Sequence, residues 1–120
     1  MKKIMIIEDD KDLLEIVRLA LKGKYSLQLQ TDNRDIVRVT REFDPDLILI
    51  DNYIGEKQAG ELIKEIQNSD YPKKILFILF SGAENIRQIA AEIGADSWLA
   101  KPFLLSELIN RIEHTFTLNS

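Results

Sequence analysis

Cysteine and long apolar runs are missing from this chain. None of its 120 residues is cysteine, which excludes disulfide bonds and thiolate metal sites and suits a reducing compartment. The first apolar run, residues 4–7, mimics the start of a secretory signal, but Glu8 ends it well short of the roughly 7–15 residues that such a signal needs. No run approaches the length that crosses a bilayer. We therefore expect a cytoplasmic protein without membrane contact.

An excess of basic charge is missing too. The chain has 16 lysine and arginine residues against 20 aspartate and glutamate residues, and its net charge is -4. A nucleic-acid-binding surface needs a basic stripe, so direct DNA or RNA binding is not expected. The hydrophobic fraction of 45% and the charged fraction of 30% are typical of a soluble globular protein. At this length we expect a single domain over residues 1–120 with no output domain.

Segments with strand patterns alternate with segments of helical spacing. Short runs that are apolar throughout, or apolar at alternate positions, predict strands at residues 4–7, 25–30, 47–50, 75–80 and 97–100. Apolar positions at helical spacing predict a helix after each strand, within residues 13–21, 36–43, 62–66, 86–93 and 105–116. The chain is thus expected to contain five consecutive strand–helix units.

This alternation predicts an α/β fold with a doubly wound, five-stranded parallel sheet and helices on both faces. Residues 25–30 are half polar and residues 97–100 form the shortest strand, so both belong at sheet edges. The other three strands are then central. The strand order 2-1-3-4-5, as in flavodoxin-like folds, fits this arrangement.

Chemically useful side chains stand where these strands end. They are Glu8 and Asp9 after the first strand, Asp51 after the third, Ser81 after the fourth and Lys101 after the fifth. Such sheets bind ligands outside the carboxyl ends of their strands, so we expect these side chains to meet in one crevice. Clustered carboxylates persist best around a cation, and oxygen ligands without histidine or cysteine favour Mg²⁺. A lysine and a serine beside them can bind phosphate, which suits phosphoryl transfer onto a carboxylate.

The same residues lie in four motifs that resemble those of receiver domains from two-component response regulators. The motifs are residues 6–10, residues 46–51, the strand that ends at Ser81, and residues 94–103. They follow the family's order and spacing, and the resemblance covers essentially the whole chain. It implies a phosphorylation-activated signalling switch that receives a phosphoryl group from a sensor histidine kinase or a histidine phosphotransfer protein. Such a switch is not an enzyme for other substrates, because it assists only its own phosphorylation and dephosphorylation.

The resemblance also gives a role to each residue of the proposed phosphorylation site. Asp51 looks like the phosphoacceptor. Glu8 and Asp9 look like the acids that bind Mg²⁺, Asp9 directly and Glu8 through water. The backbone carbonyl of Tyr53 would be a third protein ligand of the metal, and Lys101 looks like the lysine that contacts phosphate.

Switching is assigned by the same resemblance. Ser81 looks like the switch hydroxyl, Trp98 stands where the family has its switch aromatic, and the Lys101–Pro102 peptide bond is expected to be cis. Phosphate on Asp51 would draw Ser81 inward and let Trp98 turn. The face formed by the fourth helix, fifth strand and fifth helix would then change for an unknown downstream protein. Oligomeric state stays open, with a homodimer as one option.

The residues after Asp51 depart from the family's usual pattern. The family usually has proline four residues after its phosphoacceptor and glycine eight residues after it, where this chain has Gly55 and Ala59. The next glycine is Gly60, so the loop is one residue longer. Glycine in place of a residue with a fixed φ predicts a more mobile loop. The bulky Tyr53 is expected to lie across the crevice and to slow the loss of phosphate.

Other functions compete with this interpretation. A phosphohydrolase of the haloacid dehalogenase type needs a second acid two residues after its nucleophile, where this chain has Tyr53, and it needs a substrate cap. A flavin-binding electron carrier needs a phosphate cradle after the first strand, where residues 8–10 are acidic. A receiver-shaped interaction module that acts without phosphorylation is the remaining alternative, although the complete set of site residues weighs against it. Asp10 is expected to cap the first helix rather than to bind metal.

Overall fold

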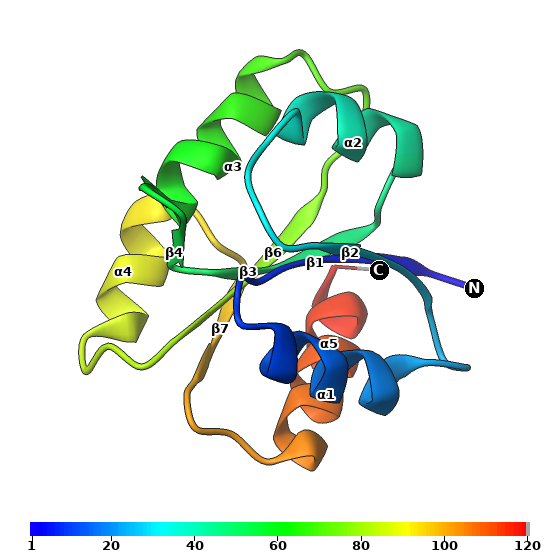
Figure 1. Ribbon diagram of the computed structural model, residues 1–120, viewed down its shortest axis with the longest axis vertical. Helices are drawn as coiled ribbons and strands as arrows, with labels where there is room; N and C mark the ends of the chain where they lie inside the picture. Colours follow the sequence, from blue (N-terminus) through cyan, green and yellow to red (C-terminus); the bar gives the residue numbers. More distant parts are fainter. Residues whose placement is uncertain (120) are drawn as a thin grey trace.

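The computed structural model describes residues 1–119, which form strands and helices in strict alternation except at one hairpin (Figure 1). The strands are β1 (Lys3–Ile7), β2 (Ser26–Gln30), β3 (Leu47–Asp51), β4 (Tyr53–Ile54), β5 (Lys57–Gln58), β6 (Leu76–Ser81) and β7 (Ser97–Ala100). The helices are α1 (Lys11–Leu21), α2 (Ile36–Phe43), α3 (Ala59–Asn68), α4 (Ile86–Ile93) and α5 (Leu105–Leu118). The predicted α/β class is confirmed.

The main sheet has five parallel strands in the order β2-β1-β3-β6-β7. Without the two short hairpin strands this is the predicted order 2-1-3-4-5, with the half-polar β2 and the short β7 at the edges. The register pairs Ile7 with Ile50 and Asp51 with Phe80. The carboxyl ends of β1, β3 and β6 therefore lie nearly level, and the residues that follow them emerge at one edge of the sheet.

Alternate residues of the central strands pack into two separate apolar layers. In β1, Met5 and Ile7 join the layer beneath α2, α3 and α4, whereas Ile4 and Ile6 join the layer beneath α1 and α5. Figure 1 shows these two groups of helices on opposite faces of the sheet. All four side chains are 0% exposed, and burying each such side chain stabilises the fold by about 1.5–3 kcal/mol. The sheet is consequently a well-packed platform for the residues at its edge.

A short antiparallel hairpin occupies the segment where the sequence predicts a polar loop. Tyr53 of β4 pairs with Gln58 of β5, and Ile54 pairs with Lys57. Gly55 is the first of the two residues between the strands and has a φ of +63°. A two-residue hairpin turn of type II′ favours glycine at this position. The residue that departs from the family's usual proline is therefore the one that lets the chain turn back here.

Local signals account for the helix starts nearest the site. Asp10 caps α1 as predicted, since its Oδ1 accepts hydrogen bonds from the backbone N–H groups of Asp12 at 3.0 Å and Leu13 at 3.2 Å. At α5, the Glu107 carboxylate accepts a hydrogen bond from the backbone N–H of Leu104 at 3.0 Å. Within residues 1–119, no helix combines the length and the apolar character that a membrane span requires.

Candidate functional site

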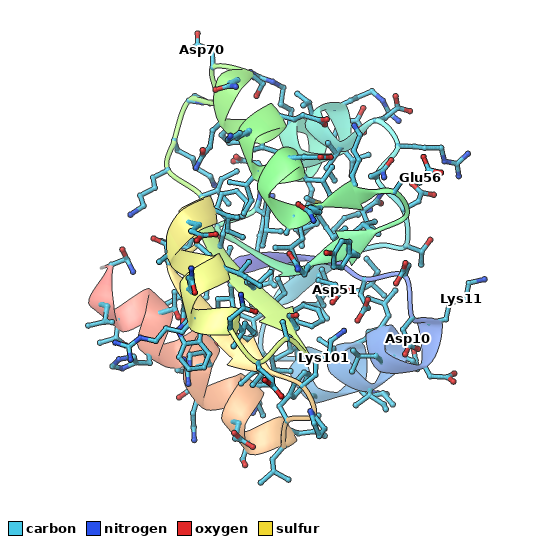
Figure 2. All side chains as sticks on the ribbon, turned by 90° about the vertical axis from the view of Figure 1, so that its left-hand side faces the viewer. Asp10, Lys11, Asp51, Glu56, Asp70 and Lys101 are labelled. Carbon is cyan, nitrogen blue, oxygen red and sulfur yellow. The ribbon has the colours of Figure 1, made fainter. Side chains whose placement is uncertain are left out.

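The strands bring the five side chains that were expected to meet to the carboxyl edge of the sheet. Glu8 and Asp9 follow β1, Asp51 ends β3, Ser81 ends β6 and Lys101 follows β7. Figure 2 shows Asp51 and Lys101 close together, between the β4–β5 hairpin and the start of α1. The parallel register explains the meeting, because residues that are far apart in the sequence end their strands at the same level.

Lys101 joins two of the carboxylates directly. Its Nζ donates hydrogen bonds to Glu8 Oε1 at 2.8 Å and to Asp51 Oδ1 at 2.9 Å. The Glu8 side chain is only 1% exposed, while those of Asp51 and Lys101 are 17% and 26% exposed. Lys101 therefore compensates the negative charges of Glu8 and Asp51, which water reaches only in part. Removal of the lysine would leave these buried charges uncompensated. The Lys101–Pro102 peptide bond is cis, as predicted.

Burial and pairing have opposite effects on the charges of this cluster. Desolvation raises the pKa of the Glu8 carboxyl, despite the hydrogen bond from Lys101, and the nearby Asp51 charge raises it further. Burial alone would lower the pKa of the Lys101 ammonium, but its hydrogen bonds and charge interactions with Glu8 and Asp51 outweigh that effect and raise it. Lys101 therefore stays charged. Further positive charge beside Glu8 would stabilise the charged form of its carboxyl.

Asp9 adds a third carboxylate to the same place. One carboxylate oxygen each from Glu8, Asp9 and Asp51 lies within 4.8 Å of the others. Glu8 is buried, Asp51 is half-buried and Asp9 is exposed, so the cluster has a closed side and an open side. Oxygen ligands around such a space fit a hard divalent cation that keeps some of its water molecules. The donor set is therefore suited to Mg²⁺.

The pairing in the hairpin sets the direction of the Tyr53 carbonyl. The backbone N–H of Ala59 donates to the Asn52 carbonyl at 2.8 Å, which makes these residues a hydrogen-bonded pair. Hydrogen-bonded and non-hydrogen-bonded pairs alternate along an antiparallel ladder, so the Tyr53 carbonyl points away from its partner Gln58. The Tyr53 side chain is 55% exposed, and its hydroxyl accepts a hydrogen bond from the Gln58 amide at 3.1 Å.

Ser81 and Trp98 lie at the side of the site nearest α4 and α5. Ser81 is buried, and its Oγ accepts a hydrogen bond from the backbone N–H of Ala83 at 3.1 Å. Trp98 is half-buried and packs against the apolar layer beneath α2, α3 and α4. In the ladder Trp98 pairs with Leu79, two residues before Ser81 on the neighbouring strand. The two predicted switch residues thus belong to adjacent strands.

Arg111 of α5 is a partner of Trp98 that sequence reasoning did not identify. Its guanidinium carbon lies 5.2 Å from the centroid of the indole ring, and its Nη1 donates to the Trp98 carbonyl at 2.8 Å. A cation over an aromatic face contributes about 0.5–1 kcal/mol at an exposed site. Arg111 is six residues beyond the first helical position of α5, and nothing in its spacing distinguishes it from other surface cations.

Comparison with known families identifies the family of this chain. A family model described as the response regulator receiver domain matches residues 4–113. The chain belongs to this family. Its membership supports a role in two-component signalling and in phosphorelay, and receiver domains typically bind Mg²⁺ at an acidic pocket like the one that Glu8, Asp9 and Asp51 form.

Solved receiver-type structures share the fold of this receiver domain. The chemotaxis response regulator CheY4 of Vibrio cholerae matches with a TM-score of 0.86 at 19% identity, covering 96% of this chain and 98% of that chain. The receiver domain of the Francisella response regulator 1452 matches with a TM-score of 0.85 at 19% identity and covers 100% of both chains. The non-phosphorylated HemR receiver domain from Leptospira biflexa matches with a TM-score of 0.82 at 24% identity, covering 96% and 94%.

The crowding of three carboxylates in this receiver domain gives a stability prediction. Asp9→Asn removes one negative charge within 4.8 Å of two others. In the absence of metal the variant should be more stable than the wild type by about 1 kcal/mol, because like charges at this distance repel each other by about that much even in water. Added Mg²⁺ should raise the thermal midpoint of the wild type through binding to the folded state, and should raise that of Asp9→Asn far less.

Asp12→Asn is the matched control for this measurement. Asp12 is an exposed acid in the first turn of α1, outside the carboxylate cluster. Its neutralisation should lower stability slightly, since an acid near a helix start is favourable, and should leave the response to Mg²⁺ intact. A metal-free Asp9→Asn variant that is less stable than the wild type and still responds fully to Mg²⁺ would contradict the assignment.

Proposed function

We propose that this protein is a phosphorylation-activated switch that accepts a phosphoryl group on Asp51. The observation that carries the proposal is the pair of hydrogen bonds from Lys101 to Glu8 and Asp51, with Asp9 completing the acidic cluster. Phosphoryl transfer onto a carboxylate requires a cation beside the acceptor and a positive side chain that can contact the phosphoryl group. The acidic cluster can bind the cation, and Lys101 is the positive side chain. The phosphodonor is a sensor histidine kinase or a histidine phosphotransfer protein.

Asp9, Asp51 and the Tyr53 carbonyl would hold Mg²⁺ directly, and Glu8 would hold it through water. The outward direction of the Tyr53 carbonyl and the closeness of the three carboxylate oxygens support this set. When bound, the ion would offset the charge of the phosphoryl oxygens as they approach an acidic site. Such a cation would also stabilise the charged form of Glu8, since desolvation by burial raises the pKa of this carboxyl.

The transfer step exchanges one bond to phosphorus for another. An oxygen of the Asp51 carboxylate attacks the phosphorus of a phosphohistidine, the new P–O bond forms, and the P–N bond breaks with its electron pair returning to the imidazole. Lys101 is already hydrogen-bonded to the attacking carboxylate and can follow the charge onto the phosphoryl group. In the later hydrolysis a water oxygen attacks the phosphorus and the P–O bond to Asp51 breaks, which releases inorganic phosphate and restores the carboxylate. The protein assists only these two reactions on itself.

Ser81 and Trp98 would carry the signal away from Asp51. The Ser81 hydroxyl can donate to a phosphoryl oxygen, which would draw the end of β6 toward the site and alter the space beside Trp98. Arg111 ties the indole and the Trp98 carbonyl to α5, so a movement of Trp98 reaches the surface of α4, β7 and α5. A local change of charge would thus bias a surface that a downstream protein reads.

An apolar groove beside Lys101 is suited to the phosphodonor. Leu13 and Ile16 of α1 form one wall, Phe103 and Leu105 form the other, and Lys101 belongs both to the groove and to the acidic site. Ile16 is 47% exposed although it is strongly apolar. A donor protein seated in this groove would bring its phosphohistidine directly to the residue that contacts Asp51.

Phosphorylation of Asp51 can be tested with a small donor. After incubation with acetyl phosphate and Mg²⁺, intact mass measurement should show one added phosphoryl group on the wild type. The group should be stable to acid and labile to base, as expected of an acyl phosphate, and Asp51→Asn should gain none. Asp46→Asn, at the opposite end of the same strand segment, should be phosphorylated like the wild type. An unmodified wild type would favour the receiver-shaped module that acts without phosphorylation.

Tyr53 is expected to protect the phosphorylated form. Residues 51 to 54 alternate between outward and buried positions, so Asp51 and Tyr53 lie on the same side of the chain. Tyr53→Ala should shorten the lifetime of the phosphorylated protein roughly three- to tenfold, equivalent to about 1 kcal/mol of barrier. Tyr53→Phe keeps the ring without the hydroxyl and should keep the lifetime. Equal lifetimes for the wild type and Tyr53→Ala would exclude shielding by this ring.

The groove makes a separate prediction about protein donors. The donor in this test is a histidine phosphotransfer protein that phosphorylates the wild type. Ile16→Asp should slow transfer from it roughly tenfold, which is the effect of losing one well-buried apolar contact at an interface. Phosphorylation by acetyl phosphate should be unchanged. Leu19→Asp, at an equally exposed position of α1 outside the groove, is the control. Equal transfer rates for Ile16→Asp and Leu19→Asp would place the donor elsewhere.

A further inference from the structure

Two hydrogen bonds fix the backbone on either side of the Tyr53 carbonyl. Before it, the Asn52 carbonyl accepts from the backbone N–H of Ala59 at 2.8 Å. After it, the Ile54 carbonyl accepts from the side-chain amide Nδ2 of Asn33 at 2.9 Å. The Tyr53 carbonyl is therefore the middle one of three, and its direction depends on how firmly its two neighbours are held.

Asn33 reaches this position from another part of the fold. It belongs to the connection between β2 and α2, 21 positions before Ile54 in the chain. The Ile54 side chain is 0% exposed and packs in the apolar layer beneath α2, α3 and α4. Ile54, the residue after Tyr53, is thus held by its buried side chain and by the hydrogen bond from Asn33 to its carbonyl.

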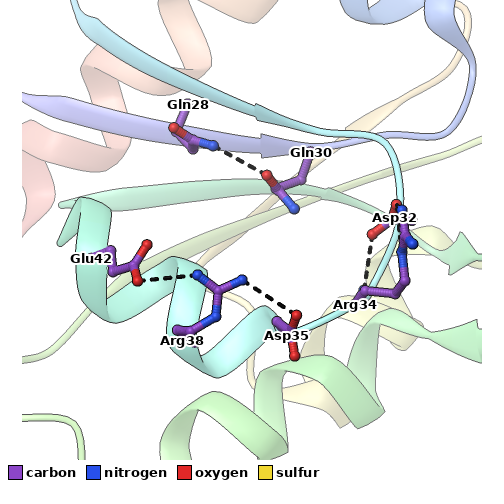
Figure 3. Close-up of polar contacts among 7 residues, drawn as sticks. All are labelled: Gln28, Gln30, Asp32, Arg34, Asp35, Arg38 and Glu42. Atoms are coloured by element: carbon purple, nitrogen blue, oxygen red, sulfur yellow. Dashed lines mark hydrogen bonds and ion pairs between the residues drawn. The ribbon is translucent and has the colours of Figure 1, made fainter.

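Local contacts order the connection that carries Asn33 (Figure 3). On one side, Asp32 accepts from the backbone N–H of Arg34 at 3.0 Å and forms an ion pair with its guanidinium at 2.9 Å. On the other side, Asp35 has a left-handed φ of 52° and pairs with Arg38 of α2 at 3.3 Å. These contacts flank Asn33 on both sides, and the bond from the Arg34 backbone N–H to Asp32 closes the turn in which it lies.

Gly55 lies in the hairpin turn beside Asn33. A Cβ atom at this position would lie 3.4 Å from Asn33 Nδ2, and the φ of +63° would strain any other residue. The left-handed φ of the hairpin turn, rather than a lack of space beside Asn33, therefore favours glycine at this position. The residue at which the chain departs from the family's usual proline thus lies next to the Asn33 side chain.

We propose that Asn33 is a positioning residue for the phosphorylation site. Its amide holds the Ile54 carbonyl and thereby keeps the preceding Tyr53 carbonyl directed at the space among Glu8, Asp9 and Asp51. Asn33 touches neither the metal nor the phosphoryl group, and it acts through the hairpin. This inference rests on the proposed function, because it assumes that the Tyr53 carbonyl is a ligand of Mg²⁺.

A purely structural role for the same hydrogen bond makes a different prediction. If Asn33 only stabilises the hairpin, its loss lowers the free energy of unfolding and leaves the affinity for Mg²⁺ unchanged. If it positions the carbonyl, the affinity for Mg²⁺ falls in the folded protein. Titration calorimetry with Mg²⁺ alone, on the full chain and well below its thermal midpoint, separates the two roles without any measurement of phosphorylation.

Asn33→Leu removes the amide donor while keeping the size and charge of the side chain. It should weaken Mg²⁺ binding roughly three- to tenfold, the value of one net hydrogen bond. Asn110→Leu, an exposed asparagine on α5, should bind Mg²⁺ like the wild type. Asn33→Gln keeps the donor on a longer side chain and should recover part of the lost affinity. If Asn33→Leu does not fold, Asn33→Ser takes its place, with the same expected direction.

The outcomes distinguish the inference from the proposed function. Equal affinity for Mg²⁺ in the wild type and in the Asn33 variants, with binding lost in Asp9→Asn, would overturn the positioning role and leave the metal site intact. A wild type that binds no Mg²⁺ would overturn both. Weaker binding in Asn33→Leu with partial recovery in Asn33→Gln supports the role of the amide itself, since a loss caused by altered packing would not be restored by a longer side chain.

Discussion

Lys101 donates to two carboxylates from different strands, and the geometry of the acidic site depends on these two contacts. Glu8 is almost completely buried and Asp51 is partly buried, so neither charge is fully solvated by water. One lysine can bond both carboxylates only if β1 and β3 end at the same level. The parallel register of these strands meets this condition. The apolar run of β1 maintains that register, because a slip by one residue would carry the charged Lys3 or Glu8 into a position between the two apolar layers.

The same contacts leave the site short of positive charge. Three carboxylates gather near one lysine, and Asp9 faces the open side of the cluster. A divalent cation would add positive charge beside the three acids. Lys101 could then contact a phosphoryl group on Asp51 without any rearrangement of the sheet. Asn33 joins the β4–β5 hairpin to the β2–α2 connection. Trp98 and Arg111 form the side that faces α4 and α5.

Periodicity and spacing were sufficient to predict the sheet order and the meeting of Glu8, Asp9, Asp51 and Lys101. Apolar runs record burial on both faces, and residues at strand ends must meet once the strands are parallel and adjacent. The fourth strand begins at Leu76, one residue later than predicted, because the apolar Ile75 contributes to the core without joining the ladder. The apolar pattern alone cannot distinguish these two situations.

Contacts made by polar side chains across the fold were not predictable in this way. Residues 53–58 read as a polar loop, since strands of two residues are too short to show alternation, and only Gly55 hints at a turn. The bonds from Asn33 to Ile54 and from Arg111 to Trp98 join segments whose separation follows no period. Both contacts depend on the three-dimensional course of a connection or a helix. The contacts of Asn33 and Arg111 were therefore found only in the structure.

The most direct test of this account is a crystal structure of the protein with Mg²⁺ and beryllofluoride, a mimic of the phosphoryl group. The account predicts that beryllofluoride binds the Asp51 carboxylate and that Lys101 contacts it. It also predicts that Mg²⁺ lies among Glu8, Asp9, Asp51 and the Tyr53 carbonyl. A structure in which Asp51 stays unmodified, or in which the ion binds away from these carboxylates, would contradict it.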